Sequence, residues 1–316
     1  MASNETVALT TPYTAFKQAT HSLEILLIVG GNALTLIAVN RTKKLRIIPT
    51  NTFIVSLAVS DGLIGVLLPF IIWLNFTRDE RLWDVSTCVL RGPYYAMFDI
   101  SLSTLLVIAV DRYVAVVHPL YYRRHMTLRI ARVTAVAIWI AEFLVLTSLT
   151  CYYGTRIETV VLIPIVGNIV LYSLIYIRLS RRQRSVSTNP NGGQNAETAA
   201  FVQPSKKTKT FTKMMALVLG YLILAWLPYY ILVPIHNVND PATPRWYVYM
   251  YDVAVVLFYS NSFMNPVIYS WKSRDFKEAY IKILRCRRSL NSSTAGFRGG
   301  GGVGGAGSHS TAISHM

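Results

Sequence analysis

The chain has 316 residues, of which 53% are hydrophobic and 15% are charged, and its three cysteines are too few for a disulfide-rich scaffold. A soluble chain of this length normally divides into two domains with a more polar surface, whereas here the apolar residues form runs long enough to cross a bilayer as helices. The formal net charge of +16 does not indicate nucleic-acid binding, because the basic residues lie in short segments between apolar runs and not in a polar domain with interleaved aromatic residues.

Seven apolar runs follow one another along the chain. Only helices or closed barrels satisfy the backbone groups in lipid, and these runs are too long and too continuous for the alternating strands of a barrel. We therefore predict an all-α membrane protein with a seven-transmembrane helix bundle in residues 23–271. The predicted helices are Leu23–Asn40, Thr52–Leu74, Gly92–Val117, Ile130–Thr150, Thr159–Ile177, Met214–Ile235 and Tyr247–Trp271.

The distribution of basic residues predicts the orientation in the membrane. Lys and Arg follow the first, third, fifth and seventh runs, whereas the other connecting segments carry few basic residues and several acids. Because Lys and Arg are retained on the cytoplasmic side, we expect a multi-pass protein of the cell membrane with residues 1–22 outside and the C-terminus inside. Two sequons, at Asn4 and Asn75, lie on the outer side and are candidate glycosylation sites.

The cytoplasmic segments are polar or amphipathic. Residues of about 179–210 are predicted to form a third-loop linker, because Ser185–Ser205 is rich in Asn, Gly, Ser and Thr. Within residues 272–288, Asp275–Leu284 has the pattern of a short amphipathic helix lying on membrane lipid. Cys286 is either a palmitoylation site or a free cytosolic thiol. Residues 289–316 are predicted to form a disordered tail.

Several polar residues lie within the predicted spans. Asp61 is central in the second run, and an ionisable residue in a spanning helix is costly and usually functional. Ser101, Asn261 and Asn265 offer further oxygen atoms of the kind that a small hard cation prefers. The same residues fit an interhelical hydrogen-bond network equally well, so both interpretations stay open.

An Asp-Arg pair and several prolines are further features of the apolar runs. Asp111-Arg112-Tyr113 ends the third run at the inner face, and an Asp-Arg pair alone usually forms only a surface salt bridge. Prolines within the apolar runs remove backbone hydrogen bonds and permit kinks, and Asn265-Pro266 near the inner end of the last run is a candidate hinge.

In combination these motifs resemble the rhodopsin-like (class A) G-protein-coupled receptors over nearly the whole chain, from Leu23 to Cys286. Each motif falls in order in its own helix. The matching residues are Gly31-Asn32, Leu57-Ala58-Val59-Ser60-Asp61, Asp111-Arg112-Tyr113, Trp139, Pro164 with Tyr172, Trp226-Leu227-Pro228, Asn265-Pro266-Val267-Ile268-Tyr269 and Asp275-Phe276.

The resemblance implies a receptor, and not an enzyme, that binds an extracellular ligand and activates a heterotrimeric G protein when helix six moves outward. Arrestin and a receptor kinase are further implied partners. Arg112 would be an exposed contact for the G protein. The resemblance also implies a sodium ion as an allosteric modulator near Trp226, held by the polar residues of the spans, and no other cofactor. The implied coupling and activation residues are Asp111, Arg112, Tyr113, Pro119, Leu120, Tyr172, Asn265, Pro266 and Tyr269.

The sequence departs from the family pattern at two places. No acid occurs in Lys206–Lys209, so the usual partner of Arg112 is missing and raised basal activity is expected. Cys88 lies one residue closer to Arg112 than is usual. The family joins helix three to the second outer loop by a disulfide, which here would pair Cys88 with Cys151. The very short loop restricts that pairing, since the two Cα atoms must come within about 7 Å, so free thiols are the alternative.

The ligand pocket implied by the resemblance is rich in aromatic residues. Such residues suit a small amphipathic molecule (amine-, nucleoside- or lipid-like) or a short peptide, although several of them could simply pack between helices. Asp99 could pair with a cation near Trp226 or hydrogen-bond to helix five. The candidate residues are Tyr94, Tyr95, Phe98, Asp99, Trp226, Tyr229, Tyr230, Val233, Asp252 and Tyr259.

Two other function classes were weighed. A transporter or channel with seven helices would have inverted repeats or broken helices in matching halves, and neither is evident. A membrane hydrolase would need clustered metal ligands within the helices, whereas the six histidines lie at edges or in tails. Neither the receptor subfamily nor the ligand is assigned by the sequence.

Overall fold

The computed structural model describes residues 11–77, 87–153, 162–188, 206–235, 240 and 242–285. Asn4, Cys286 and the tail 289–316 lie outside the described residues, as does the side chain of Asn75. All of the regular elements in the described part of the chain are helices, and the prediction of an all-α protein is confirmed. The long helices are α1 (Thr11–Arg41), α3 (Thr50–Thr77), α5 (Gly92–Val117), α7 (Leu128–Tyr153), α8 (Leu162–Thr188), α10 (Lys206–Leu232) and α11 (Arg245–Lys272).

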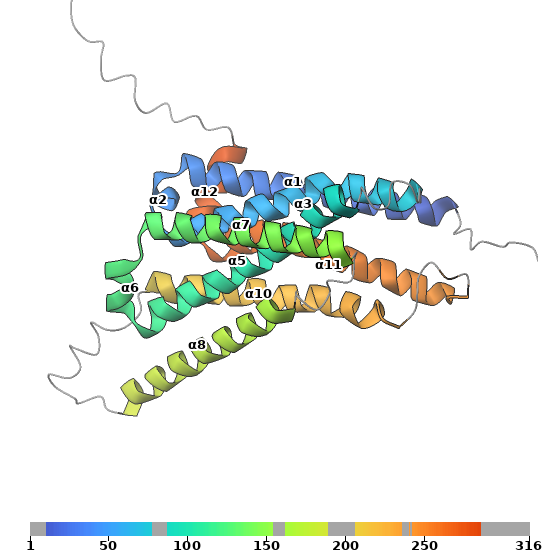
Figure 1. The fold of residues 1–316 in the computed structure, drawn as a ribbon. Helices are drawn as coiled ribbons and strands as arrows, with labels where there is room; N and C mark the ends of the chain where they lie inside the picture. Colours follow the sequence, from blue (N-terminus) through green and yellow to red (C-terminus); the bar gives the residue numbers. More distant parts are fainter. Residues whose placement is uncertain are drawn as a thin grey trace, which may run out of the picture.

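The long helices run alongside one another, and the short helices α2, α6 and α12 gather at one end (Figure 1). Helix α1 packs between α3 and α11, and α11 packs against α10, while α5 contacts α3, α7, α8 and α10 from the middle of the bundle. Helix α8 touches α5 and inclines away from the remaining helices toward the end where α6 lies (Figure 1). The short elements are α2 (Lys43–Arg46), η1 (Thr87–Arg91), α6 (Pro119–His125) and α12 (Arg274–Leu284).

Six of the described helices are long and apolar enough to cross a membrane by composition alone, and α11 is not among them. Its inner face explains the difference, because Asp252, Asn261, Ser262 and Asn265 are all buried against the bundle. These polar residues lower the mean hydropathy of α11 without exposing it to water. The predicted run Tyr247–Trp271 nevertheless lies within this one continuous helix.

The predicted boundaries differ most from the observed ones at the start of the first helix and around the third loop. Helix α1 begins at Thr11 and not at Leu23, and the predicted linker of residues 179–210 overlaps both the end of α8 at Thr188 and the start of α10 at Lys206. Apolar runs mark only the part of a helix that lies in hydrocarbon. Outside it, Lys, Arg and Gln are good helix formers and continue the helix without an apolar signal.

Helix α12 is anchored to the bundle by half of its apolar face. Phe276 and Tyr280 are buried, and the Tyr280 hydroxyl lies 2.8 Å from the Thr35 hydroxyl of α1. Ile281 and Leu284 are exposed instead, on the side left for membrane lipid. The single amphipathic face that the sequence predicts is therefore divided between the bundle and the outside.

Candidate functional site

An aromatic cluster fills the space between α5, α10 and α11. Its centre is Phe258 of α11, whose ring centroid lies 4.7 Å from that of Trp226, 4.8 Å from that of Tyr229 and 5.1 Å from that of Phe98. Tyr259 completes this set, which we call the outer aromatic cluster, with its ring 6.4 Å from that of Phe98. Four of the predicted pocket residues thus meet, but around a residue that the prediction missed.

A helical-spacing signal for Phe258 was present in the sequence. Phe258 precedes Asn261 by three residues and Asn265 by seven, so it lies on the same face of α11 as two residues that were singled out. That face is buried along its length. Phe258 would have been found by following the face of Asn261 and Asn265 one turn further toward the outer end of α11.

The outer aromatic cluster contains one polar group with no partner. The indole Nε1–H of Trp226 is buried and has no hydrogen-bond acceptor among the described residues. Nearby, Tyr94 donates a hydrogen bond of 3.0 Å to the Tyr259 hydroxyl, and the Tyr230 ring lies 5.9 Å from that of Trp226. Tyr95 packs edge-on against Tyr94. A molecule entering here would meet ring faces, hydroxyls and one spare donor.

Asp252, another predicted pocket residue, is held by α1. Its two carboxylate oxygens accept hydrogen bonds from the Tyr13 hydroxyl at 2.7 Å and from the Lys17 ammonium at 2.6 Å. The predicted residue Val233 lies just beyond the end of α10 and is half-buried. Helix α1 also brings His21 to Tyr259, with ring centroids 6.2 Å apart. The predicted first helix began at Leu23, so the contribution of α1 to this end of the bundle was missed.

Asp99 lies near Glu142 of α7. It is buried, and its Oδ1 has no hydrogen-bond partner among the described residues. The Glu142 carboxylate accepts a hydrogen bond of 2.6 Å from Ser103, one turn along α5 from Asp99. The two interpretations left open by the sequence therefore stay open, although the neighbouring acid lies on α7 and not on helix five.

A polar cluster lies deeper in the bundle around Asp61, which is fully buried. One carboxylate oxygen accepts from the Ser101 hydroxyl at 3.1 Å, and the other accepts from the Asn265 amide nitrogen at 2.7 Å. The side-chain oxygen of Asn261 is buried and has no partner among the described residues. The carboxylate, the hydroxyl and this spare oxygen fit the donor set of a small hard cation. Asn265, as placed, donates to Asp61 and does not present its oxygen.

Arg112 lies at the opposite end of the bundle within a group of partners from four elements. It pairs with Asp111 beside it on α5, and donates to the Thr50 hydroxyl of α3 at 2.6 Å and to the Tyr122 hydroxyl of α6 at 2.9 Å. Its guanidinium carbon lies 4.6 Å from the ring centroid of Phe211 on α10. We call these five residues the arginine cluster.

One expectation about Arg112 is corrected by these contacts. Arg112 is only 5% exposed, so it is a core residue in this arrangement and not an exposed contact. Asp111, Thr50 and Tyr122 bind it in the absence of an acid near Lys206, and raised basal activity stays a prediction. Burial raises the pKa of the Tyr122 hydroxyl, with Arg112 opposing that shift, so the hydroxyl stays protonated at neutral pH.

The other predicted coupling residues surround the arginine cluster unevenly. Pro119 is buried and Leu120 is 50% exposed at the start of α6, while Tyr113 is half-buried. Tyr172 of α8 is close enough to Arg112 to interact with it electrostatically. Tyr269 instead packs against Phe276, with ring centroids 5.4 Å apart, and its buried hydroxyl has no partner within the described part of the chain. Pro266 is buried within α11.

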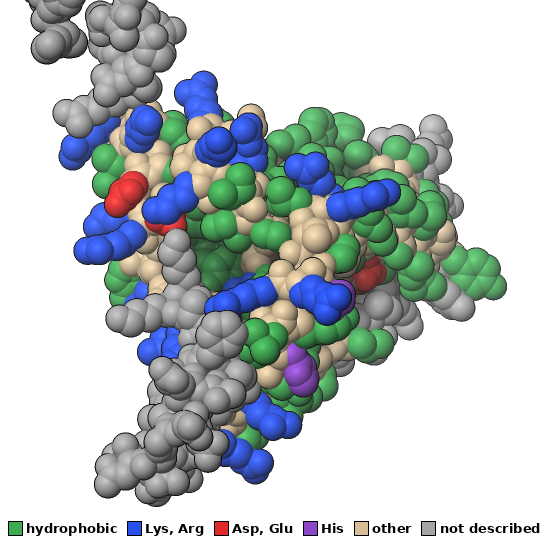
Figure 2. Space-filling view, turned by 90° about the vertical axis from the view of Figure 1, so that its left-hand side faces the viewer, with side chains coloured by type: hydrophobic (Ala, Val, Ile, Leu, Met, Phe, Trp, Pro, Cys, Tyr) green, Lys and Arg blue, Asp and Glu red, His purple; other side chains and the backbone are tan. Residues whose placement is uncertain are grey.

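The face at this end of the molecule is basic. Figure 2 shows Lys and Arg side chains gathered around a central hollow with apolar side chains at its floor, and few acidic ones. Asp275 forms an ion pair with Lys44 at 2.5 Å, and Asp275 raises the pKa of Lys44. Exposed basic residues at this end include Arg41, Lys43, Lys44, Arg46, Arg123, Arg124, Arg129, Lys213, Arg274, Lys277 and Lys282.

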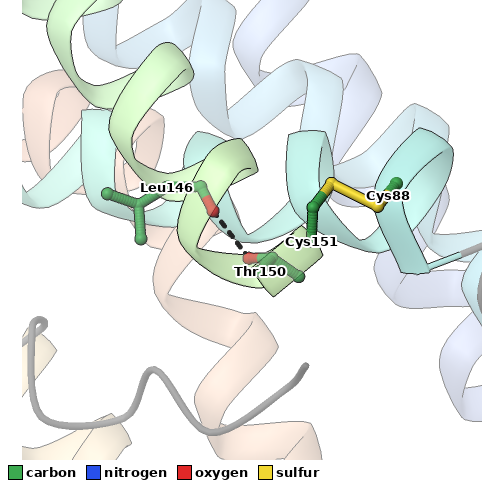
Figure 3. The surroundings of a disulfide bond; sticks show 4 residues. All are labelled: Cys88, Leu146, Thr150 and Cys151. Atoms are coloured by element: carbon green, nitrogen blue, oxygen red, sulfur yellow. Dashed lines mark hydrogen bonds between the residues drawn. A yellow bond between two sulfur atoms is a disulfide. The ribbon is translucent and has the colours of Figure 1, made fainter. Parts of the chain in front are cut away.

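A disulfide joins Cys88 of η1 to Cys151 near the end of α7, with the two Cα atoms 4.7 Å apart (Figure 3). The short segment after Cys151 does not prevent the pairing, because Cys151 itself lies on the last turns of α7. Beside it, Thr150 donates a hydrogen bond of 2.7 Å to the Leu146 carbonyl (Figure 3). The bond fixes the outer start of α5 against α7.

Comparison with known proteins gives a consistent set of matches. Residues 31–159 and 147–269 match the family model described as 7 transmembrane receptor (rhodopsin family). The adenosine receptor A3 of Bos taurus is 32% identical over 298 residues, which cover 84% of this chain and 89% of that protein. The D(1) dopamine receptor of Carassius auratus is 28% identical (84% and 87% covered), and the somatostatin receptor type 1 of Rattus norvegicus is 26% identical (84% and 70% covered). These relatives are named for a nucleoside, an amine and a peptide, so they share no single class of ligand.

Proposed function

Because the chain belongs to the rhodopsin family of seven-transmembrane receptors, we propose that it binds an extracellular ligand in the outer aromatic cluster and activates a heterotrimeric G protein through the arginine cluster. The chain is a multi-pass membrane receptor, and the expectation that it is not an enzyme is confirmed by the family. The family also rules against the alternative of a seven-helix transporter or channel.

One observation carries the proposal: a single helix reaches both clusters. Helix α10 supplies Trp226 to the outer aromatic cluster and Phe211 to the arginine cluster. Fifteen residues of helix separate them, which is a span of about 22 Å at the rise of an α-helix. Pro228 lies inside α10 two residues beyond Trp226 and weakens the backbone there. A ligand that displaces Trp226 therefore acts directly on the helix that covers Arg112.

The chemistry of the outer aromatic cluster favours a planar ligand with little positive charge. Ring faces stack on planar heterocycles, and the Trp226 N–H can donate to an acceptor on the ligand. Asp252 is neutralised by Lys17, so its carboxylate is not free to pair with an amine. A nucleoside-like ligand fits these groups better than an amine, and a lipid or short peptide comes after it.

Coupling follows from breaking the arginine cluster. When the inner end of α10 moves outward, Phe211 leaves Arg112, and the guanidinium can turn from Asp111 toward the G protein. The Asn265-Pro266 pair allows α11 to bend in the same step, and the exposed Leu120 on α6 offers an apolar contact to the G protein. The basic face would be cytoplasmic in this scheme, and arrestin and a receptor kinase would bind there after activation.

We also propose that Asp61, Ser101 and Asn261 hold a sodium ion. The ion would neutralise the buried carboxylate, which has no cationic hydrogen-bond partner among the described residues. Its binding would favour the inactive arrangement, because a ligand stabilises the state that it binds best. Asn265 would orient the Asp61 carboxylate through its amide. We further propose glycosylation at Asn4 and Asn75 and palmitoylation at Cys286.

The test of function is nucleotide exchange on purified G proteins by the receptor in lipid nanodiscs. We expect one class among adenosine and related nucleosides, amines, lysophospholipids and short peptides to stimulate exchange, with nucleosides first. A Trp226→Ala receptor should lose the response while remaining folded in the membrane. Ligand-dependent ion or solute flux in vesicles, without nucleotide exchange on any G protein, would refute the proposal.

A further inference from the structure

Phe211 is the contact that reaches Arg112 from α10. The other partners of the guanidinium are Asp111 on α5, Thr50 on α3 and Tyr122 on α6, and all three bind it through hydrogen bonds. The Phe211 ring covers it at 4.6 Å with no polar group of its own. This distance is within the range at which the negative face of an aromatic ring attracts a cation.

The inner end of α10 offers no acid that could play this part. The residues before Phe211 are Lys206, Lys207, Thr208, Lys209 and Thr210. Basic side chains cannot form an ion pair with a guanidinium, whereas the face of the Phe211 ring attracts it. Arg112 is 5% exposed, and loss of water around a cation strengthens its interaction with a ring.

The register of α10 holds the ring at this position. Met214, Met215 and Val218 follow Phe211 at spacings of three, four and seven residues and are buried in the bundle core. These neighbours fix the same face of α10 toward α5. Replacing Phe211 alone therefore leaves the packing of the next two turns in place.

We propose that Phe211 is a positioning residue that latches α10 to α5 by a cation–π contact with Arg112, in place of the missing acid. The latch closes the receptor when no ligand is bound and must break when the inner end of α10 moves outward. The role of Arg112 after release rests on the proposed function, whereas the latch is a property of the receptor alone.

The expected effect follows from the energy of such contacts. A desolvated cation–π contact changes a two-state equilibrium by about five- to thirtyfold. Removing the aromatic face while keeping an apolar side chain should raise the ratio of open to closed receptor by that factor. An aromatic replacement should leave the ratio within about twofold.

The experiment measures the distance between the inner ends of α7 and α10 in the full chain in nanodiscs, without ligand or G protein. Spin labels are placed at the exposed residues Arg129 and Lys213 in a Cys286→Ser background, and pulsed electron–electron double resonance gives the populations. Phe211→Leu should increase the long-distance population five- to thirtyfold, whereas Phe211→Trp should not. Equal distributions for Phe and Leu, or equal shifts for Leu and Trp, would overturn the proposal.

Two controls separate a latch from simple packing. Phe70→Leu makes the same chemical change at an exposed site of α3 and should leave the distances unchanged. In an Arg112→Gln background, which removes the cation, Phe211→Leu should have no further effect. Additive effects of the two substitutions would refute the latch.

The same receptors also distinguish failure of the latch from failure of the proposed function. Nucleotide exchange is measured on each variant in a separate assay. Distances that respond as expected, with no exchange on any G protein, would leave the latch standing and remove the coupling role of Arg112. Nucleotide exchange by a receptor whose distances do not depend on Phe211 would support the proposed function and refute the latch.

Discussion

The outer aromatic cluster and the arginine cluster share two helices, α5 and α10, but differ in the kinds of side chain that form them. The outer cluster consists of neutral rings and leaves the Trp226 N–H without a partner. The inner cluster surrounds one charge with an acid, two hydroxyls and a ring. A ligand that fills the outer aromatic cluster can satisfy its unpartnered donor. A partner that separates the arginine cluster can bind the released charge of Arg112. A helix that joins the two can convert one event into the other.

The largest expected effect comes from removing the charge of the inner cluster. Arg112→Ala should abolish ligand-stimulated nucleotide exchange. It should also lower stability by about 1–3 kcal/mol, because Asp111 and Thr50 lose a buried partner. Thermal unfolding and surface expression measure the loss of stability. Arg112→Lys keeps the charge but loses the planar donor set, so its exchange activity and stability should lie between those of the unmodified receptor and the Ala variant. Full exchange by the Ala variant would exclude Arg112 from coupling.

The second expected effect concerns sodium, between the two clusters. With sodium at about ten times its Kd, agonist affinity should fall by about tenfold relative to a bulky monovalent cation at the same ionic strength. Asp61→Asn should remove this dependence, because an amide lacks the charge that holds the ion. Asp252→Asn makes the same change outside the polar cluster and should keep it. Agonist affinity that ignores sodium in the unmodified receptor would leave Asp61 as part of a hydrogen-bond network only.

The difference between the clusters also decides what the sequence could predict. The long helices follow from apolar runs, and Asp61, Arg112 and Trp226 stand out because polar or motif residues in a span are unusual. Their partners do not stand out. Phe211 and Phe258 are unremarkable within their own helices, and their importance arises from contacts with α5. Side-chain pairing between helices depends on rotation and register, which hydropathy along a single run does not encode.

The third prediction sharpens the comparison at the outer cluster. Trp226→Phe keeps an aromatic ring but removes the unpartnered N–H, so thermal stability should stay the same or rise slightly, since a buried orphan donor is lost. Affinity for the activating ligand should fall about three- to tenfold if the N–H donates to it. Competition binding and thermal unfolding of the same samples measure both. Unchanged affinity would show that the ligand binds by ring contacts without this donor.

The smallest expected effect is at the tether between α1 and α11. Lys17→Met removes the ion pair with Asp252 but keeps a flexible apolar side chain, and the Tyr13 hydroxyl can still donate to the carboxylate. Lys17 is 40% exposed, so we expect a loss of less than about 1 kcal/mol, seen as a small drop in Tm at low salt. The difference from the unmodified receptor should shrink as salt screens the pair. A drop that persists unchanged at high salt would mean that Lys17 acts by packing. In that case apolar contacts, like those in the outer aromatic cluster, position the outer end of α11. The outer end of the bundle would then depend on apolar contacts and the inner end on the charge of Arg112.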